Sequence, residues 1–522
     1  MKNLLSTFLL FALLQSAYIF SESSYGASAC CKQGANPSKS VFLDTYDVFS
    51  VASPLTWFSR DVLLEEGCPA ITFMPFAFSG TSRGSRQVAR RFGIAGNGIC
   101  TDGIHISNKM DPNAAAYGLL GPGADVQAIH LNINTTGDEF RSTVFFMPET
   151  SFWGVHAACF LPVYCFESGD LWVSVSLPIG IRKNRMNVHE TGVSESVQAA
   201  SGERGLDGAP FVASATDAFC QSNWRFGKIN GCASAPSFLD ASGVGDIECT
   251  LGYSSSLCEG IQAHLFGGAV LPGDSSQTAE WVYQPLLGNG GHTGLFAGAG
   301  CSCPVLDNEY VGCTVHAAAD AQYFFSRQQY RSFDLQGKPW SRYMGFFASQ
   351  DQAASYSTAS GGGVSGVNHC TRCVKILPGV VAHTMLALEF AAERGNFVFG
   401  LQGVHSGGER LIVPCSFDGA IKSSMVNNAK RLSAARTIRD TFFEADLPLD
   451  RWDSVSIGVN AVDWQSGLME PSFDVGAFFM MRHTGHMRDR PVNCMAGLLL
   501  DGLFGNRASE KWGFVCSLSV GW

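Results

Sequence analysis

Alternation of apolar and polar residues with a period of two recurs along the chain and predicts a protein built of β-strands. In residues 171–179, Leu, Val and Ile occupy every second position, with Trp, Ser and Pro between them. The same period runs through residues 396–402, 454–461 and 472–479. Because successive side chains of a strand point to opposite faces, each stretch predicts a half-buried strand. Weaker strand candidates are residues 71–78, 128–135, 143–148, 263–270, 294–300, 314–325 and 382–391.

The face opposite the apolar residues separates two β architectures. In a soluble sandwich that face carries many charged side chains, whereas here it consists mainly of Ser, Gly, Asn and Gln. A polar but uncharged face is typical of the water-facing interior of a transmembrane β-barrel, whose other face contacts lipid. A soluble β-sandwich or repeat array is the alternative.

The segments between strand candidates differ greatly in length. Residues 184–261 form a long segment that is rich in Gly, Ser and Ala, residues 349–368 are of low complexity, and residues 427–443 are the most helix-like stretch. Transmembrane barrels combine short turns at one end with long loops at the other, and ordinary domains rarely contain such loops. We therefore predict an all-β fold: a single transmembrane antiparallel β-barrel of roughly 12–18 strands with long extracellular loops. The segment 184–261 is the loop that we expect to fold inward or to be tied by disulfides.

The last residues of the chain, 511–522, predict a strand with one apolar face. The residues on that face are Trp512, Phe514, Cys516, Leu518, Val520 and Trp522. A terminal strand of this kind that ends in an aromatic residue resembles the assembly signal of Gram-negative outer-membrane barrels. The resemblance implies that the barrel-assembly machinery recognises this strand and that it pairs with the first strand. Cys516 would then be a free thiol on the lipid face.

The N-terminus predicts export. Lys2 precedes an apolar run at residues 4–14, and Ala27 and Ala29 form an Ala-x-Ala cleavage site, so we expect a signal peptide at 1–29 and a mature barrel at 30–522. After that segment no continuous apolar window is long enough for a transmembrane helix. A membrane-embedded mature chain must therefore be a closed barrel, because barrel closure satisfies every backbone group in lipid.

Composition and charge agree with this picture. Only 15% of the residues are charged, against roughly 25% in an ordinary soluble domain, while the chain has 58 Gly and 38 Phe. Such a composition fits a β-rich protein with part of its surface in an apolar medium. The formal net charge of −10 argues against nucleic acid as a partner, since phosphate binding needs clustered Lys and Arg.

Eighteen cysteines, scattered along the chain, fit an oxidising compartment. The sequence HCTRC at 369–373 could be a redox or zinc site, but no second pair has its spacing and no helix pattern follows it. Disulfides are the main interpretation, although spacing does not reveal the connectivity. The candidate disulfide cysteines are Cys220, Cys232, Cys249, Cys258, Cys301, Cys303, Cys370 and Cys373.

No catalytic, cofactor or metal site is predicted. The Gly-rich stretches at 361–366 and 288–300 lack the strand, glycine turn and helix order of a phosphate loop, and we interpret them as turns or loop. No Gly-x-Ser-x-Gly nucleophile motif occurs, and the histidines are spread singly. A hydrolytic barrel enzyme is therefore only a minor alternative.

Signal peptide, acidic charge, many cysteines and absent transmembrane helices together resemble the cysteine-rich major outer-membrane porins of intracellular bacteria. Residues 271–292 and 331–344 resemble stretches of uncharacterised predicted outer-membrane proteins of such bacteria. The resemblance implies a porin-like passive channel for small solutes in the bacterial outer membrane, with outer-membrane lipid as a partner and homo-oligomers left open. The alternative is a structural or adhesive surface barrel cross-linked by disulfides.

Overall fold

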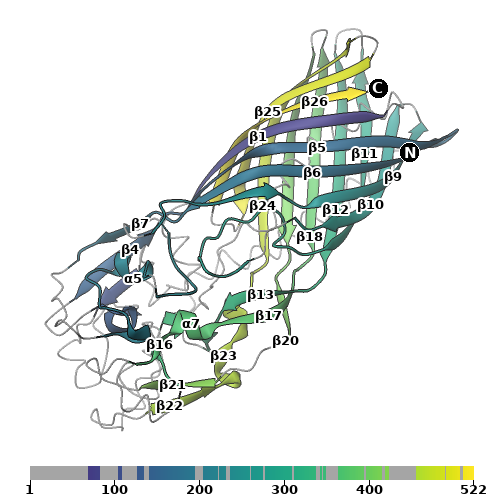
Figure 1. The fold of residues 1–522 in the computed structure, drawn as a ribbon. Coiled ribbons are helices and arrows are strands. Elements are labelled where there is room, and N and C mark those ends of the chain that lie inside the picture. The colour runs from purple at the N-terminus through teal and green to yellow at the C-terminus, as the bar shows by residue number, and fades with distance from the viewer. Residues whose placement is uncertain are drawn as a thin grey trace.

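The fold was analysed on a computed structural model (Figure 1). It describes residues 69–82, 104–107, 126–133, 140–193, 204–221, 223–230, 235–258, 260–273, 277–308, 311–336, 341–343, 345–348, 362–392, 395–413, 418–422, 454–487, 490–505 and 509–521. The signal peptide with Ala27 and Ala29, the helix-like stretch 427–443, Cys232 and Trp522 lie outside these residues.

Twelve antiparallel strands close into a barrel in the described part of the chain (Figure 1). In chain order the first strand of the barrel pairs with the last, as the resemblance to outer-membrane barrels implied, and the second strand pairs with the third, which completes the closed sheet. In spatial order the strands are β5 (Glu149–Phe166), β1 (Ala70–Ser82), β26 (Ser509–Gly521), β25 (Arg490–Gly505), β24 (Ser472–Met487), β19 (Gly395–Ser406), β18 (Val381–Ala392), β12 (Gly312–Phe324), β11 (Gly294–Asp307), β10 (Ile261–Leu271), β9 (Ile247–Cys258) and β6 (Gly169–Arg185).

The two ends of the barrel differ. At one end only a few residues join consecutive strands, for example between β5 and β6 or between β18 and β19, and both β1 and β26 have their chain-terminal ends there. All the long connections leave from the other end. In outer-membrane barrels the short turns are periplasmic and the long loops extracellular, so we name the two ends accordingly.

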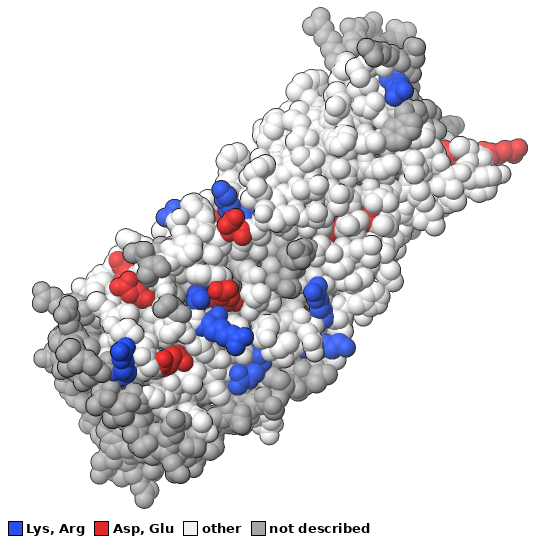
Figure 2. Space-filling view, viewed as in Figure 1, with Lys and Arg blue, Asp and Glu red and all other residues white. Residues whose placement is uncertain are grey.

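The outer face of the barrel is apolar. Trp512, Phe514 and Leu518 of β26 are 60%, 48% and 44% exposed, and Cys516 between them is a free thiol, which confirms the predicted face. The same alternation exposes Phe397, Phe399 and Leu401 of β19. In Figure 2 the barrel wall is almost without charge, whereas Lys, Arg, Asp and Glu gather over the extracellular part. This is the apolar band that a bilayer requires.

The extracellular connections fold into a second body with its own core, a feature that the sequence analysis did not anticipate. Buried residues from five separate connections pack together there, among them Phe140, Phe219, Phe333, Ile376 and Leu468. We call this body the extracellular domain. Its strands and helices are β2 (Ile104–Ser107), β3 (Val126–Gln127), η3 (Ala128–Leu131), β4 (Arg141–Phe146), β7 (Val188–Thr191), η4 (Leu206–Gly208), α5 (Ala215–Phe219), β13 (Arg327–Ser332), β14 (Asp334–Leu335), η5 (Ser341–Tyr343), β15 (Gly345–Phe346), β16 (Val364–Ser365), α7 (Gly366–Cys370), β17 (Thr371–Leu377), β20 (Arg410–Val413), β21 (Asp418–Lys422), β22 (Ser454–Gly458), η8 (Val459–Ala461), β23 (Val462–Asp463) and η9 (Trp464–Gly467).

Several strand predictions need correction in this light. The candidates 71–78, 263–270, 294–300, 314–325 and 382–391 all lie in barrel strands. Residues 143–148 and 454–461 contain strands β4 and β22, but these belong to small sheets of the extracellular domain, and residues 128–135 begin with the 3-10 helix η3. Local alternation predicts a strand, but only long-range pairing decides which sheet the strand joins.

The predicted long loop also ends earlier than expected. The strands β8 (Leu239–Val244) and β9 lie within residues 184–261, and both pair with β6. Ala241 of this segment packs against the side chains of the barrel interior, and so does Leu287 of the loop 272–293, for which no inward position was predicted. None of the helices in the described residues is long and apolar enough to cross a membrane.

Candidate functional site: the barrel lumen and its extracellular mouth

A belt of hydrogen-bonded polar side chains lines the periplasmic half of the lumen. Trp172 Nε1 donates to Ser254 Oγ over 2.9 Å, and that hydroxyl lies 2.7 Å from His264 Nδ1. On β1 and β26, with only β5 between β1 and β6, Thr72 Oγ1 donates to Ser519 Oγ over 2.9 Å. All of these residues are buried. Mutual hydrogen bonds satisfy these groups in an interior where an unpaired polar group would be costly.

Glu389 of β18 is the hub of this belt. Arg482 Nη1 donates to its two carboxylate oxygens over 3.0 and 3.1 Å, and Asn396 Nδ2 donates over 2.6 Å. His316 Nε2 donates to the same carboxylate over 2.9 Å. Because a carboxylate accepts only, His316 Nε2 carries a proton, and its Nδ1 lies 2.9 Å from Ser302 Oγ. Three strands besides β18 are tied together through this one carboxylate.

The series Ser302, His316 and Glu389 has the connectivity of a nucleophile, a base and an orienting acid. Acyl transfer would also require backbone N–H groups aimed at an oxyanion. Around Ser302 the backbone pairs with Gln262 on one side and with His316 on the other, within the barrel ladder. We therefore interpret the series as part of the structural belt.

Above the belt the lumen has an apolar wall. The buried strand side chains of this wall come from β1, β5, β18, β19, β24, β25 and β26, and they are Met74, Phe76, Phe152, Met385, Ala387, Val398, Phe478, Met480, Met495, Leu499 and Val515. The sequence analysis predicted a polar lumen, and at this height the prediction is wrong. Inner side chains can be apolar where they pack against one another instead of contacting water. The alternation along a single strand does not show where such packing occurs.

Aromatic rings lie against glycines of neighbouring strands along the inner wall. A Cβ atom built on Gly400 would collide with the ring of Phe478, and one on Gly298 would collide with that of Phe266. The same relation holds for Gly252 with Trp172, Gly513 with Phe78, Gly294 with Phe324 and Gly268 with Phe296. Each ring covers the bare backbone of its glycine, as in designed barrels where aromatic residues compensate glycines. This pairing gives the high Gly and Phe content of the chain a structural role.

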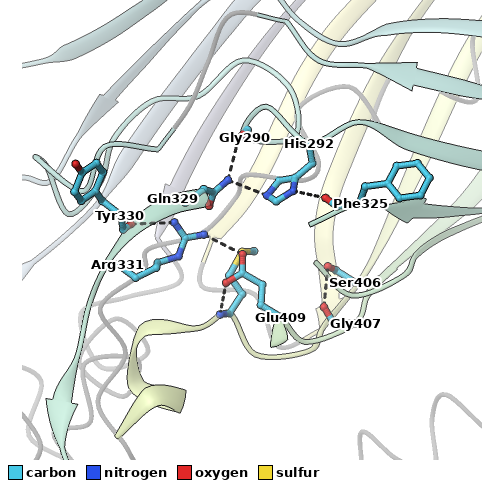
Figure 3. Close-up of polar contacts among 10 residues, drawn as sticks. Gly290, His292, Phe325, Gln329, Tyr330, Arg331, Ser406, Gly407 and Glu409 are labelled. Atoms are coloured by element: carbon cyan, nitrogen blue, oxygen red, sulfur yellow. Dashed lines mark hydrogen bonds and ion pairs between the residues drawn. The ribbon is translucent and has the colours of Figure 1, made fainter. Parts of the chain in front are cut away.

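The extracellular mouth is held by a network around His292 (Figure 3). His292 Nδ1 donates to the carbonyl of Phe325 over 2.8 Å, and its Nε2 accepts from Gln329 Nε2 over 2.8 Å. Gln329 Nε2 also donates to the carbonyl of Gly290 over 2.9 Å. Both partners therefore require the neutral imidazole with its proton on Nδ1. The network fastens the inward loop 272–293 to β13.

An ion pair lies next to this network. Arg331 Nη2 donates to Glu409 Oε1 over 3.0 Å, and Glu409 Oε2 accepts from the backbone N–H of Met469 over 2.9 Å (Figure 3). Both side chains are almost fully buried. A second buried pair joins Arg342 to Asp334 over 3.1 Å. The Arg331–Glu409 pair links β13, which continues from β12, to the connection between β19 and β24, whereas the Arg342–Asp334 pair lies within the connection between β12 and β18.

The two stretches that resemble other outer-membrane proteins meet at this mouth. Residues 271–292 contribute Gly290 and His292, and residues 331–344 contribute Arg331 and both members of the Asp334–Arg342 pair. Side chains from both stretches, Trp281, Val282, Arg331 and Tyr343, also line one small pocket. The sequence showed that each stretch resembles other outer-membrane proteins, but only the tertiary structure shows that the two stretches meet.

Acidification is expected to loosen the mouth. Burial lowers the pKa of His292 below its usual value of 6.5. The imidazole of His292 therefore binds a proton less readily in the folded protein than in the unfolded chain. The stability that neutral His292 contributes is fully present above about pH 6.5 and is lost as the pH falls through the lower pKa of the folded state. Limited proteolysis of the purified protein at pH 7.5 and pH 5 should show faster cleavage of the extracellular domain at pH 5. In His292→Gln this difference should shrink; an unchanged difference would assign the effect to other groups.

The predicted disulfides are mostly absent from the described residues. Cys220 is disulfide-bonded, whereas no disulfide is formed by Cys249, Cys301, Cys303, Cys370 or Cys373. Barrel register explains three of them, because the residues opposite Cys249, Cys301 and Cys303 are not cysteines. The side chain of Cys258 lies outside the described part.

The HCTRC sequence is split between two environments. Cys370 is buried at the end of α7, and Cys373 is exposed on β17. Burial raises the pKa of the Cys370 thiol, whereas a redox-active thiol needs a lowered pKa. Among the described residues no group of three or more His, Cys, Asp or Glu side chains is arranged to hold a metal ion.

Comparison with known proteins adds similarities of fold only. No family model and no curated protein matches the chain. Among solved structures, an outer-membrane channel from Pseudomonas putida F1 aligns with a TM-score of 0.37 and 9% identity, covering 87% of this chain and 95% of that one. The transport unit of the Escherichia coli autotransporter AIDA-I gives a TM-score of 0.27 at 7% identity, covering 86% and 89%. The Pseudomonas putida toluene transporter TodX gives 0.23 at 10% identity, covering 94% and 95%.

Sequence identities and TM-scores this low do not identify a function, whereas the barrel itself has several informative features. Its closed antiparallel strands, uncharged apolar outer band, short turns at one end and long loops at the other are the features of outer-membrane barrels. The protein is a β-barrel of the bacterial outer membrane.

Proposed function

We propose that the protein is an outer-membrane channel for small solutes with an apolar body, and that the structure represents its closed state. The observation that carries the proposal is the lumen, where an apolar, Met-rich wall stands above a polar belt. A porin for hydrophilic solutes keeps a continuous water-filled lumen. An apolar constriction instead excludes water, and unbranched Met side chains can repack around different apolar molecules.

The inward loop supports a closed state. Leu287 packs into the apolar wall, and the carboxylate of Asp246 accepts hydrogen bonds from the backbone N–H groups of Gly273 and Asn289 over 3.1 and 2.7 Å. Arg182 donates to the carbonyl of Leu286 over 3.4 Å. Loop 272–293 is thereby tied to the barrel rim at the point where a solute would enter.

The test is solute uptake by proteoliposomes that contain the full-length protein. A small neutral aromatic solute should enter faster than a sugar of similar size. Gly400→Ala should slow aromatic uptake severalfold, because the new methyl group pushes the Phe478 ring into the lumen. Gly403→Ala, on the outward face of the same strand, is the matched control and should leave uptake unchanged, since its nearest neighbour is the hydroxyl of Thr384. Equal entry of the sugar would instead support a polar porin.

A second candidate function is a surface anchor, in which the barrel only holds the extracellular domain. The separate core of that domain favours it. Absence of uptake for every solute, in protein that shows heat-modifiable migration, would support the anchor and contradict the channel. Disulfide cross-linking between neighbouring molecules remains a prediction of this alternative, and ladders on non-reducing electrophoresis would reveal it.

A further inference from the structure

Four neighbouring strands of the lumen form an aromatic floor between two carboxylates. In one row across the sheet, Gly252 of β9, Phe266 of β10, Gly298 of β11 and Asp320 of β12 stand side by side. Phe296 stands in the next row, opposite Gly268. Because the rings of Phe266 and Phe296 extend over Gly298 and Gly268, they lie along the wall, 6.4 Å apart between centroids. Both rings are only half-buried and face the lumen.

The two carboxylates stand on either side of this floor. Asp320 accepts a hydrogen bond from His383 Nδ1 over 2.9 Å. Glu248 of β9 lies on the other side, opposite Val270 of β10 and Ser176 of β6. Glu248 interacts electrostatically with Asp320 and Asp246, which places these carboxyl groups near one another.

Buried polar groups without partners also stand on the inner face of the barrel, with Ser176 opposite Glu248 and Gln402 opposite Met385. Gln402 is 4% exposed, and neither atom of its amide has a hydrogen-bond partner. The Oγ of Ser176, 7% exposed, and the Nδ1 of His156, 6% exposed, also have none. A buried polar group without a partner costs free energy that a bound molecule or water can recover. These groups are independent of the carboxylates and indicate an occupant.

We propose that this part of the lumen is a binding site for a small organic cation, such as an alkylated ammonium. The faces of Phe266 and Phe296 offer the negative side of their quadrupoles, Glu248 and Asp320 offer carboxyl groups, and Gln402 and Ser176 offer hydrogen bonds to a polar substituent. The apolar wall around Met385 receives the alkyl groups. The binding site itself does not depend on the proposed channel. Only the statement that such a cation is a transported solute rests on the proposed function.

The test compares choline with its neutral isostere 3,3-dimethyl-1-butanol, by titration calorimetry on the full-length protein in detergent. Choline should bind at least about tenfold more tightly, since a desolvated cation–π contact and a carboxylate together exceed 1.4 kcal/mol. Asp320→Asn and Glu248→Gln should each weaken choline binding about tenfold and leave the isostere unchanged. Glu280→Gln, which removes an exposed carboxylate paired with Lys228, is the control and should not change choline binding.

Equal binding of the two probes, or choline binding that neither Asp320→Asn nor Glu248→Gln weakens, would overturn the site. Heat-modifiable migration verifies that each variant has folded, and two variants keep the test decisive if one fails to fold. The outcomes also separate the two proposals. Choline binding without any solute uptake would retain the site and contradict the channel, whereas aromatic uptake without choline binding would retain the channel and contradict the site.

Discussion

Glu409→Ala should destabilise the extracellular domain by about 3–5 kcal/mol, because it leaves the buried guanidinium of Arg331 without its counter-charge. The substitution also removes the acceptor of the Met469 N–H, so a second buried group loses its partner. Thermal unfolding of the purified protein and the rate of tryptic cleavage of the extracellular domain would measure the loss.

The chain offers a matched control for this effect. Lys228 and Glu280 form an ion pair of similar length, 3.2 Å, but their side chains are 18% and 48% exposed. Glu280→Gln should therefore cost only about 0–1 kcal/mol. The double variant Arg331→Met with Glu409→Leu should recover most of the loss, since an apolar pair of similar volume avoids the desolvation of two charges. Equal effects of Glu409→Ala and Glu280→Gln would contradict the importance of burial.

Glu389→Gln should weaken the barrel by about 3–5 kcal/mol, because it removes the charge that balances Arg482 inside the lumen. The amide also cannot accept all of the hydrogen bonds that the carboxylate receives from Arg482, His316 and Asn396. The temperature at which the folded, fast-migrating form disappears on unboiled gels should fall markedly.

The control for this variant is a neutral contact of the same belt. Thr72→Val removes the hydrogen bond to Ser519 and should cost only about 1 kcal/mol. Adding Arg482→Gln to Glu389→Gln should restore part of the stability, since two amides can bond to each other without a buried charge. If Glu389→Gln were no worse than Thr72→Val, the carboxylate would not be the hub of the belt.

Much of the barrel wall could be predicted from the sequence, because a strand with one lipid face repeats a pattern of period two within a few residues. This is why residues 171–179 and the terminal strand, with Trp512, Phe514 and Leu518 outward, are where they were expected. The same local signal could not distinguish β22 of the extracellular domain from a barrel strand. Pairing partners lie far away in the chain, and alternation says nothing about them.

The candidate site was less accessible to sequence reasoning. Phe478 stands on the face that was expected to be polar, and only its cross-strand neighbour Gly400 explains how its ring fits against the wall. The histidines appeared as isolated residues, yet His316 meets Glu389 across 73 positions and His292 meets Gln329 across 37. The sequence did show a high content of Gly and Phe, and a resemblance of residues 271–292 and 331–344 to other outer-membrane proteins. Neither observation shows which residues are neighbours in the folded protein.

By itself the sequence determined a lipid-facing β wall, its closing strand and the division into short turns and long connections, because each depends on neighbours in the chain. The tertiary structure decided the apolar wall of the lumen, the carboxylates beside Phe266, the inward loop and the core of the extracellular domain. These features arise where strands and loops distant in sequence share one enclosed space. There burial, charge pairing and shape act between residues that no local pattern relates.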